Sequence, residues 1–442
     1  MGGPSRGDLD RVARRAAEAV DGERVVDLTR DLVRIRSVCR PHDAAGTEAA
    51  VARFLASHLA QRGLRVSTHE VAPGRPNVIA DWHPGGKGRG LILEGHTDVV
   101  TPGDESSWTF GPFDAVLADN RIYGRGAADM KGGLAAAICA IDAVRTTAPE
   151  LPGRVRLAAV VDEEAMMLGI KAFVREGWAR GFDAAIVCEP EENELCLVQK
   201  GALRVVATFR GKMAHGAMPY AGINPITPAA RFVSRLADEE RRQHTRYGRH
   251  PHLGLPHLTA TTFRAPLHGD PQFNVMAGEA QVTVDVRTVP GQDHGEVLAA
   301  LRALALPARD EDAAAEVTPA AEVTPAAEGT PAAKVTAGAE VTLECVEDRP
   351  WTETPADAPI VDALERAYHV ALGRPPRYGG VPGSTDGTIL HAWAGLPIVT
   401  VGPGNRHIPH QRDEYVDVGE LIDAARLYAA AIVYFLGAAA AA

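Results

Sequence analysis

The amino-acid sequence predicts an α/β protein: a three-layer domain with a mostly parallel sheet, interrupted by a smaller α+β domain of ferredoxin-like order. Three observations lead to this fold class. The chain has 442 residues, more than a single hydrophobic core usually organises. Strand patterns alternate with helical patterns up to about residue 200 and again after residue 348. Between these regions the order becomes β-α-β-β-α-β. We therefore expect one domain over residues 1–200 and 349–442, with residues 201–348 inserted into it.

The first region opens with apolar residues at helical spacing between positions 8 and 38. A further helix is predicted over 47–62, because Gly63 fits a C-cap. Alternating residues predict strands at 64–71 and 76–82, and the apolar run LILEGHTDVV at 91–100 predicts a central strand. Helix 132–148, strand 154–164, helix 169–179 and strand 184–190 continue the alternation, which is typical of a largely parallel sheet.

The inserted region predicts strands at 203–211, 258–265, 277–289 and 339–348, with helices at 228–242 and 295–306. After Pro350, a helix at 358–372, a strand at 396–402 and a closing helix at 419–436 return to the first pattern. Residues 315–342 form a six-residue repeat rich in Ala, Pro, Thr and Glu, which is too short to bury a core. We predict a flexible loop there, with a partner-binding segment as the alternative.

Composition excludes several classes of function. The formal charge of -11 and the pI near 5.8 argue against nucleic acid or an anionic membrane as a partner, since both require a basic surface. The five cysteines form no Cys-x-x-Cys pair, and their odd number argues against a disulfide framework. The amino terminus lacks the apolar core of a signal peptide, and no run approaches about 18 apolar residues. We expect a cytoplasmic protein.

Polar side chains stand where the strands are predicted to end. A lone strand-end Glu or loop His is usually a solvated residue. Here several follow consecutive strands of one sheet, and the carboxyl ends of parallel strands are the usual place for ligands in α/β folds. The side chains are His96, Asp129, Glu163, Glu164, Glu189 and His410.

Two imidazoles and three carboxylates suffice for a pair of metal ions about 3.5–4 Å apart, provided that one carboxylate bridges them. His, Asp and Glu suit zinc, and cobalt or manganese can substitute. The predicted ligands are His96, Asp129, Glu164, Glu189 and His410. Glu163 is left without a metal and can act as the base that deprotonates an attacking water.

The motifs GHTDVV, YGRGAADMKGG, DEE, CEP and GPGNRHIPHQRDEYV occur in this order. In this they resemble the di-zinc amidohydrolase and exopeptidase family of acetylornithine deacetylase, succinyl-diaminopimelate desuccinylase, aminoacylase and glutamate carboxypeptidase. The resemblance covers nearly the whole chain outside the repeat and the termini. It implies that Asp129 bridges two metals, that His96 and Glu189 bind one, and that His410 and Glu164 bind the other.

The resemblance also implies supporting roles. Asp98 would hold the His96 imidazole through its carboxylate, Glu163 would be the general base, and the Asp129–Met130 peptide bond would be cis. His407 is the alternative to His410, but the spacing from GPG favours His410. After the paired glutamates this chain departs from the family, because AMML replaces the usual Glu and Gly residues and makes the rim apolar.

The inserted domain resembles the family's lid and dimerisation domain, which implies a homodimer. Its motif GKMAHGAMP implies that His215 polarises the scissile carbonyl. By the same resemblance Asn274 and Arg287 hold the substrate, although a surface salt bridge is an equally good reading of Arg287. In the loop GSTDG, Gly383 and Ser384 would line the pocket for an acyl group or carboxylate.

We therefore expect a zinc-dependent hydrolase that cleaves the amide bond of a small N-acyl amino acid, of the acetylornithine deacetylase or succinyl-diaminopimelate desuccinylase type. Carboxypeptidase or dipeptidase action on small peptides is the alternative. A non-catalytic binding protein is a remote one, because a chain without activity would be expected to have lost at least one member of the predicted site.

Overall fold

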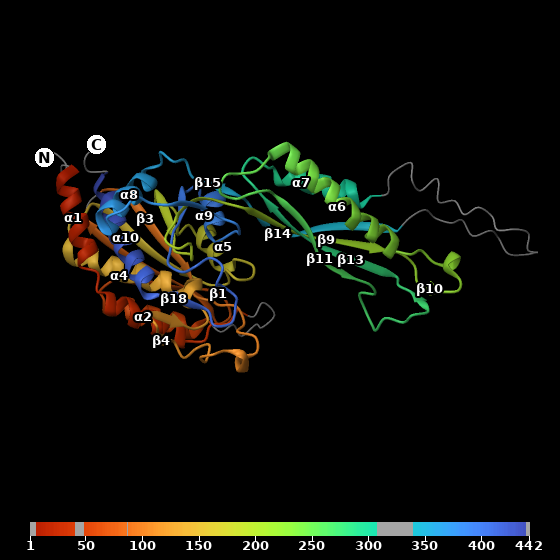
Figure 1. Ribbon diagram of the computed structural model, residues 1–442, viewed down its shortest axis with the longest axis horizontal. Coiled ribbons are helices and arrows are strands. Elements are labelled where there is room, and N and C mark those ends of the chain that lie inside the picture. Colours follow the sequence, from red (N-terminus) through yellow and green to blue (C-terminus); the bar gives the residue numbers. More distant parts are fainter. Residues whose placement is uncertain (1–5, 40–47, 86, 307–338, 439–442) are drawn as a thin grey trace, which may run out of the picture. The chain divides into compact units, whose positions relative to one another are not determined.

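The computed structural model describes residues 6–39, 48–85, 87–306 and 339–438 (Figure 1). Of the six-residue repeat, only residues 339–342 fall within this range, so the predicted loop lies outside it. The chain divides into two compact units. Unit 1 comprises Met1–Lys200 and Pro350–Ala442, and unit 2 comprises Gly201–Arg349. None of the helices in the described residues is long and apolar enough to cross a membrane.

Unit 1 is built on a mixed sheet in the order β1-β2-β6-β3-β7-β17-β8-β15, with β16 beside β8. The central strands β6, β3, β7 and β17 run parallel to one another, whereas β2 is antiparallel to β6 and β8 is antiparallel to β17. The predicted α/β class with a mostly parallel centre is confirmed. The strands are β1 (Arg65–Ala72), β2 (Arg75–Gly85), β3 (Gly90–His96), β6 (Gly153–Val160), β7 (Ala184–Val187), β8 (Leu195–Gln199), β15 (Thr352–Glu353), β16 (Tyr378–Val381) and β17 (Ile398–Thr400).

Helices cover both faces of this sheet, which gives the three predicted layers. Successive side chains of a strand point to opposite faces, so Leu91 and Leu93 of β3 join one core while Ile92 joins the other. The first core is shared with α1 (Arg6–Glu18), α2 (Gly22–Arg34), α3 (Ala49–Gln61), α4 (Gly132–Thr147), α8 (Pro359–Ala367) and α10 (Val418–Gly437). The second is shared with α5 (Leu168–Arg175) and α9 (Gly387–Ala394).

Unit 2 has the predicted β-α-β-β-α-β order. Its antiparallel sheet runs β11-β13-β9-β14, with α6 and α7 packed on the same face (Figure 1). Along β13, Ala280, Val282, Val284 and Val286 are buried toward the helices, while the residues between them are more exposed. The elements are β9 (Gly201–Arg210), α6 (Ile226–Tyr247), β11 (His257–Arg264), β13 (Glu279–Thr288), α7 (His294–Ala305) and β14 (Glu340–Arg349).

Two short sheets complete the described structure. In unit 2, β10 (Ala214–His215) pairs with β12 (Val275–Met276). In unit 1, β18 (Tyr415–Asp417) pairs with β5 (Arg121–Tyr123), which pairs with β4 (Val116–Ala118). This last sheet connects the end of the chain with the loop that precedes α4, and it therefore brings the predicted ligands on either side together.

Candidate metal centre

Parallel strand pairing brings the first group of predicted ligands to one place. His96 is the last residue of β3 and lies beside Val160, the last residue of the neighbouring β6. Glu163 and Glu164 follow β6, and Glu189 follows β7 on the other side of β3. Because the three strands run in the same direction, their carboxyl ends deliver these side chains to the same end of the sheet.

Asp129 occupies the centre of this group. Its Oδ1 lies 3.0 Å from His96 Nε2, and its Oδ2 lies 3.4 Å from His410 Nε2. Glu164 faces the same nitrogen of His410 at 3.1 Å, and Glu189 Oε1 lies 3.7 Å from His96 Nε2. One carboxylate thus faces two imidazoles, each of which also faces a carboxylate of its own. This is the arrangement that a bridged pair of cations requires.

Glu414 fixes the loop that carries Asp129. Its Oε1 accepts hydrogen bonds from the backbone N–H groups of Gly126, Ala128 and Asp129 at 2.9–3.1 Å. Its Oε2 pairs with the buried guanidinium of Arg125. The peptide bond between Asp129 and Met130 is cis, as predicted. The sequence motif ended in Asp413-Glu414-Tyr415 but gave no sign that Glu414 reaches back almost 290 positions to this loop.

The role of Asp98 differs in detail from the prediction. His96 Nδ1 donates to the backbone carbonyl of Asp98 at 2.9 Å, whereas the Asp98 carboxylate lies 3.7 Å away. The two carboxylate oxygens instead accept from the backbone N–H groups of Glu163 and Glu164, both at 3.2 Å. Because a carbonyl only accepts, Nδ1 of His96 carries a proton, and the neutral imidazole would present the lone pair of Nε2 to a cation.

The buried carboxylates of the site shift the pKa values of the side chains around them. Burial lowers the pKa of His96, but the carboxylates of Glu189 and Asp129 outweigh it and raise that pKa well above the usual value. Hydrogen bonds to Asp129 and Glu164 raise the pKa of His410 to about 10. Burial, followed by repulsion from Asp129, raises the pKa of Glu189 well above its usual range. Two divalent cations would supply this positive charge instead, and the mixed nitrogen and oxygen donors suit zinc, cobalt or manganese.

Two buried acids beside the site escaped the sequence analysis. Glu94 precedes His96 by two residues on β3, and Asp386 belongs to the GSTDG loop at the start of α9. Both are almost completely buried, and their carboxyl groups face each other, so a proton on one can be donated to the other. Burial raises the pKa of Glu94 to about 8, and burial and repulsion from Glu94 raise that of Asp386. Their neutral forms are therefore favoured in the fold.

The GSTDG loop is fastened to the end of β8. The hydroxyl of Ser384 donates to the carbonyl of Lys200 at 2.6 Å, and Thr385 donates to Gln199 through both its backbone N–H and its hydroxyl. Gly383 is half-buried, and a Cβ at this position would meet nothing within 4 Å. The loop thus keeps open space at Gly383, while the Ser384 hydroxyl is engaged with the backbone.

In unit 2 the two-stranded sheet of β10 and β12 brings His215 and Asn274 together. His215 pairs with Val275, and Gly216 N–H donates to the Asn274 carbonyl at 2.7 Å. His215 Nδ1 accepts from Ala217 N–H at 3.0 Å, which leaves the proton on Nε2. Arg287 is bidentate to Asp285 at 2.7 and 3.3 Å, the salt bridge that sequence reasoning weighed against substrate binding.

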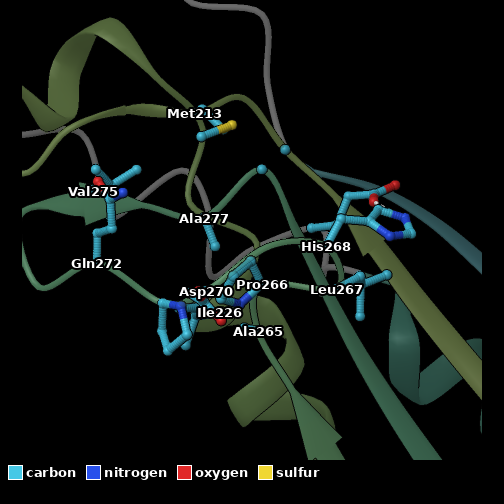
Figure 2. Close-up of a pocket in the computed structure, with 14 residues that line it drawn as sticks. Met213, Ile226, Ala265, Pro266, Leu267, His268, Asp270, Gln272, Val275 and Ala277 are labelled. Carbon is cyan, nitrogen blue, oxygen red and sulfur yellow. Dashed lines mark ion pairs between the residues drawn. The ribbon is translucent and has the colours of Figure 1, made fainter.

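A cavity of about 580 Å³ lies beside this two-stranded sheet (Figure 2). Its walls are largely apolar, with Met213, Ile226, Leu267 and Val275 among them, and His268 and Asp270 add polar groups. None of the predicted site residues lines it. It is therefore a feature of unit 2 that is separate from the metal ligands.

Comparison with known proteins defines the class. The profile of Peptidase family M20/M25/M40 matches residues 92–434, most of the chain, and the chain belongs to this family. Among curated relatives, the succinyl-diaminopimelate desuccinylase of Methylocella silvestris is 29% identical over 416 residues, covering 91% of this chain and 96% of that protein. The probable succinyl-diaminopimelate desuccinylase of Staphylococcus epidermidis is 30% identical over 268 residues, covering 56% of this chain. The match spans 64% of that relative's length.

Solved structures share the fold. The di-peptidase Dug1p of Saccharomyces cerevisiae has a TM-score of 0.72 at 14% identity, covering 97% of this chain and 98% of that one. The YXEP protein of Bacillus subtilis, described as a dinuclear metal binding peptidase of the M20 family, has a TM-score of 0.66 at 17% identity, covering 93% and 97%. Both likenesses cover nearly the whole chain, so both units belong to the shared architecture.

Proposed function

We propose that this chain is a metal-dependent hydrolase that cleaves the amide bond of a small N-acyl amino acid with a free carboxylate. The observation that carries the proposal is the position of Asp129 between His96 and His410, with Glu163 close to His96. When bound, two divalent cations would supply a Lewis acid for the scissile carbonyl and would lower the pKa of the attacking water. His96 and Glu189 would hold one cation, and His410 and Glu164 the other.

In this proposal Glu163 moves the proton. Its backbone N–H is held by Asp98, and its carboxylate lies within 4.8 Å of the ligand atoms of His96 and Glu189. From there Glu163 takes a proton from the attacking water and delivers it to the leaving amine. His215 carries its proton on Nε2 and would donate it in a hydrogen bond to the oxyanion.

Asn274, Arg287, Gly383 and Ser384 are proposed to position the substrate. Asn274 lies beside His215 where β10 and β12 pair, and the open space at Gly383 supports a place for the acyl chain or carboxylate. Arg287 would bind a substrate carboxylate in competition with Asp285, its partner in the fold. Exposed apolar side chains around His215, including Met213, Met218 and Tyr220, support a homodimer through unit 2.

The names of the curated relatives favour desuccinylation or a related deacylation. Carboxypeptidase or dipeptidase action is the second candidate, because a structural neighbour that covers the whole fold is a di-peptidase. All five cysteines lie in the described residues and none forms a disulfide, which supports a reducing, cytoplasmic location. A non-catalytic binding protein is the remaining alternative.

A hydrolysis screen of the zinc-loaded protein tests the proposal. N-succinyl, N-acetyl and N-formyl amino acids are assayed beside dipeptides, and release of free amine is measured. We expect turnover of at least one acyl amino acid, and a loss of about 10²-fold or more in Glu163→Gln with the bound metal retained. Equal activity of Glu163→Gln and the unchanged protein would contradict the assigned base. Hydrolysis of dipeptides alone would favour the second candidate.

A further inference from the structure

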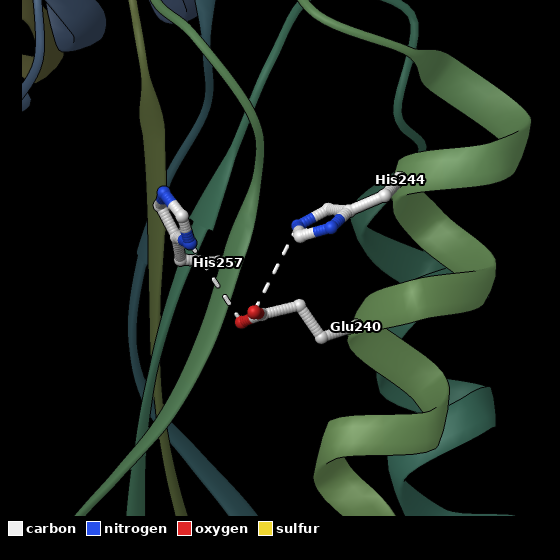
Figure 3. A group of neighbouring side chains, drawn as sticks. All are labelled: Glu240, His244 and His257. Atoms are coloured by element: carbon white, nitrogen blue, oxygen red, sulfur yellow. Dashed lines mark ion pairs between the residues drawn. The ribbon is translucent and has the colours of Figure 1, made fainter.

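Unit 2 contains a group of possible metal ligands of its own, whereas the ligands described above all belong to unit 1. The group consists of Glu240, His244 and His257 (Figure 3). Glu240 and His244 are one turn apart on α6, so their side chains share a face of the helix. His257 is the first residue of β11, which packs against α6. Figure 3 shows the three side chains pointing toward one another across this contact.

Their separations suit ligands of a common ion. His244 Nε2 lies 3.8 Å from Glu240 Oε1, and His257 Nδ1 lies 3.7 Å from Glu240 Oε2. Both distances are too long for a hydrogen bond. Two bonds of about 2.1 Å at a tetrahedral angle place ligand atoms about 3.4 Å apart. Within the candidate centre of unit 1, His96 Nε2 and Glu189 Oε1 are likewise 3.7 Å apart.

Other contacts hold two of these side chains in place. Glu240 Oε2 accepts from the backbone N–H of Leu258 at 2.7 Å, and His244 Nε2 donates to the carbonyl of Pro256 at 2.8 Å. Coordination through Nε2 would replace the bond to Pro256 and leave the proton of the neutral imidazole on Nδ1. The two side chains of α6 are therefore held by the residues on either side of His257, the third proposed ligand, where β11 begins.

The surrounding charges permit a cation. On the same helix Arg241 pairs with Asp238 and Arg242 with Glu239, while Arg246 pairs with Glu296 of α7. The group itself carries one carboxylate and two imidazoles, and all three side chains are partly exposed. A bound ion would thus keep open positions for water. Two nitrogen donors beside one oxygen favour zinc, cobalt or nickel over magnesium or calcium.

We propose that Glu240, His244 and His257 form an additional site for a divalent transition-metal ion, which ties the start of β11 to α6. The site lies wholly within unit 2 and is independent of the ligands in unit 1. An ion that binds only the folded unit stabilises it by mass action. Zinc should therefore stabilise unit 2 in a way that depends on His244 and His257.

The test measures the number of zinc ions bound per molecule of the full-length protein after chelation and dialysis against micromolar Zn²⁺. The unchanged protein should hold one equivalent more than His257→Gln and His244→Gln, while His252→Gln, which removes an exposed imidazole of the same unit, should hold the full number. Far-UV circular dichroism and zinc-free melting check that each variant is folded. The additional zinc should raise the melting temperature of unit 2 in the unchanged protein and in His252→Gln only.

Equal zinc content in all four proteins would overturn the proposal, as would a loss in His252→Gln. If a variant at His244 or His257 is unfolded without zinc, Glu240→Gln provides the second measurement. This variant keeps the shape of the side chain and removes the charge, and it should reduce zinc affinity by about tenfold or more. Unchanged affinity in a folded Glu240→Gln protein would likewise overturn the site.

Discussion

Single residues far from Asp129 in the sequence decide how its side chain is positioned, and Glu414 is the clearest case. Its carboxylate satisfies three backbone N–H groups of the Asp129 loop and the buried guanidinium of Arg125. A charge left unpaired in such a place costs far more than a surface ion pair contributes. The loop geometry therefore depends on a residue that touches no predicted ligand except through the backbone of Asp129.

Glu414→Gln should lower the free energy of unfolding of unit 1 by about 3–5 kcal/mol, because it leaves Arg125 buried without a counter-charge. It should also weaken metal retention, since the Asp129 loop loses its strongest acceptor. Urea denaturation and metal analysis after dialysis measure the two effects. Glu296→Gln, which removes the carboxylate of an exposed pair with Arg246, is the control and should cost less than about 1 kcal/mol. Similar costs in both variants would contradict the role of Glu414.

At the scale of residues, the sequence predicted those site residues whose positions follow from the order of strands along the chain. His96, Glu163, Glu164 and Glu189 each lie at or just after the end of a strand of the central parallel group, so their proximity could be predicted from strand ends alone. Glu94, Asp386 and Glu414 could not be found in this way. Their importance comes from burial and from contacts across hundreds of positions, which no local pattern records.

At the scale of elements, α4 and β7 approach each other through Gly133. A Cβ on Gly133 would lie 2.0 Å from the carbonyl oxygen of Cys188, the residue before Glu189. Helix propensity alone would favour alanine here. The close approach makes alanine at this position destabilising instead of stabilising, because the helix cannot move away without displacing the segment that carries Glu189.

Gly133→Ala should destabilise unit 1 by about 1–3 kcal/mol and weaken metal binding. Gly419→Ala is the matched control in the first turn of α10, where a Cβ meets nothing within 4 Å. This control should be neutral or stabilising by up to about 1 kcal/mol. Urea midpoints and zinc titration measure both variants, and a stable Gly133→Ala protein with unchanged zinc affinity would refute the packing argument.

Helix α3 contains a histidine that should make unit 1 sensitive to acid. His58 is half-buried against Phe54, its Nε2 has no hydrogen-bond partner among the described residues, and burial lowers its pKa below 6.5. The unfolded chain then binds the proton more readily than the folded one. The stability contributed by neutral His58 is thus complete above about pH 6.5 and is lost as the pH falls toward the lowered pKa.

His58→Leu should therefore flatten the loss of stability between about pH 7 and pH 5, as followed by urea midpoints at each pH. His252→Leu, at an exposed turn of unit 2, should leave the slope for unit 1 unchanged. If His58→Leu loses stability with acid as steeply as the unchanged protein, the acid sensitivity comes from other groups.

Some elements were predicted and others were missed for a physical reason. The long amphipathic helices and the central strands follow clear periodicity, and α6 only extends beyond its predicted ends. The strands β4, β5, β10, β12, β15 and β18 have two or three residues each, too few for a period to appear. Tertiary pairing creates them, as when β18 closes onto β5 near the end of the chain.

At the scale of the whole molecule, each hydrophobic core lies within one unit. Unit 2 has its own core between its sheet and helices α6 and α7. Its two ends are neighbours, because Ala202 of β9 pairs with Arg349 of β14. The alternation of patterns predicted this insertion, since a βαβ series was interrupted and then resumed.

Because unit 2 is an insertion, it can be excised to test whether unit 1 folds and binds metal by itself and whether unit 2 is needed for turnover. Paired residues on adjacent strands lie about 5 Å apart, so a short Gly/Ser linker can replace residues 201–349 without strain in unit 1. The shortened protein should fold cooperatively and bind metal at the unit 1 centre, because none of the five predicted ligands is removed. Its turnover should fall by about 10²-fold or more, since His215 and Asn274 are absent. Circular dichroism, zinc analysis and the amide-hydrolysis assay distinguish the outcomes: an unfolded product would contradict the independence of the unit 1 core, whereas full turnover would remove His215 from the proposed site.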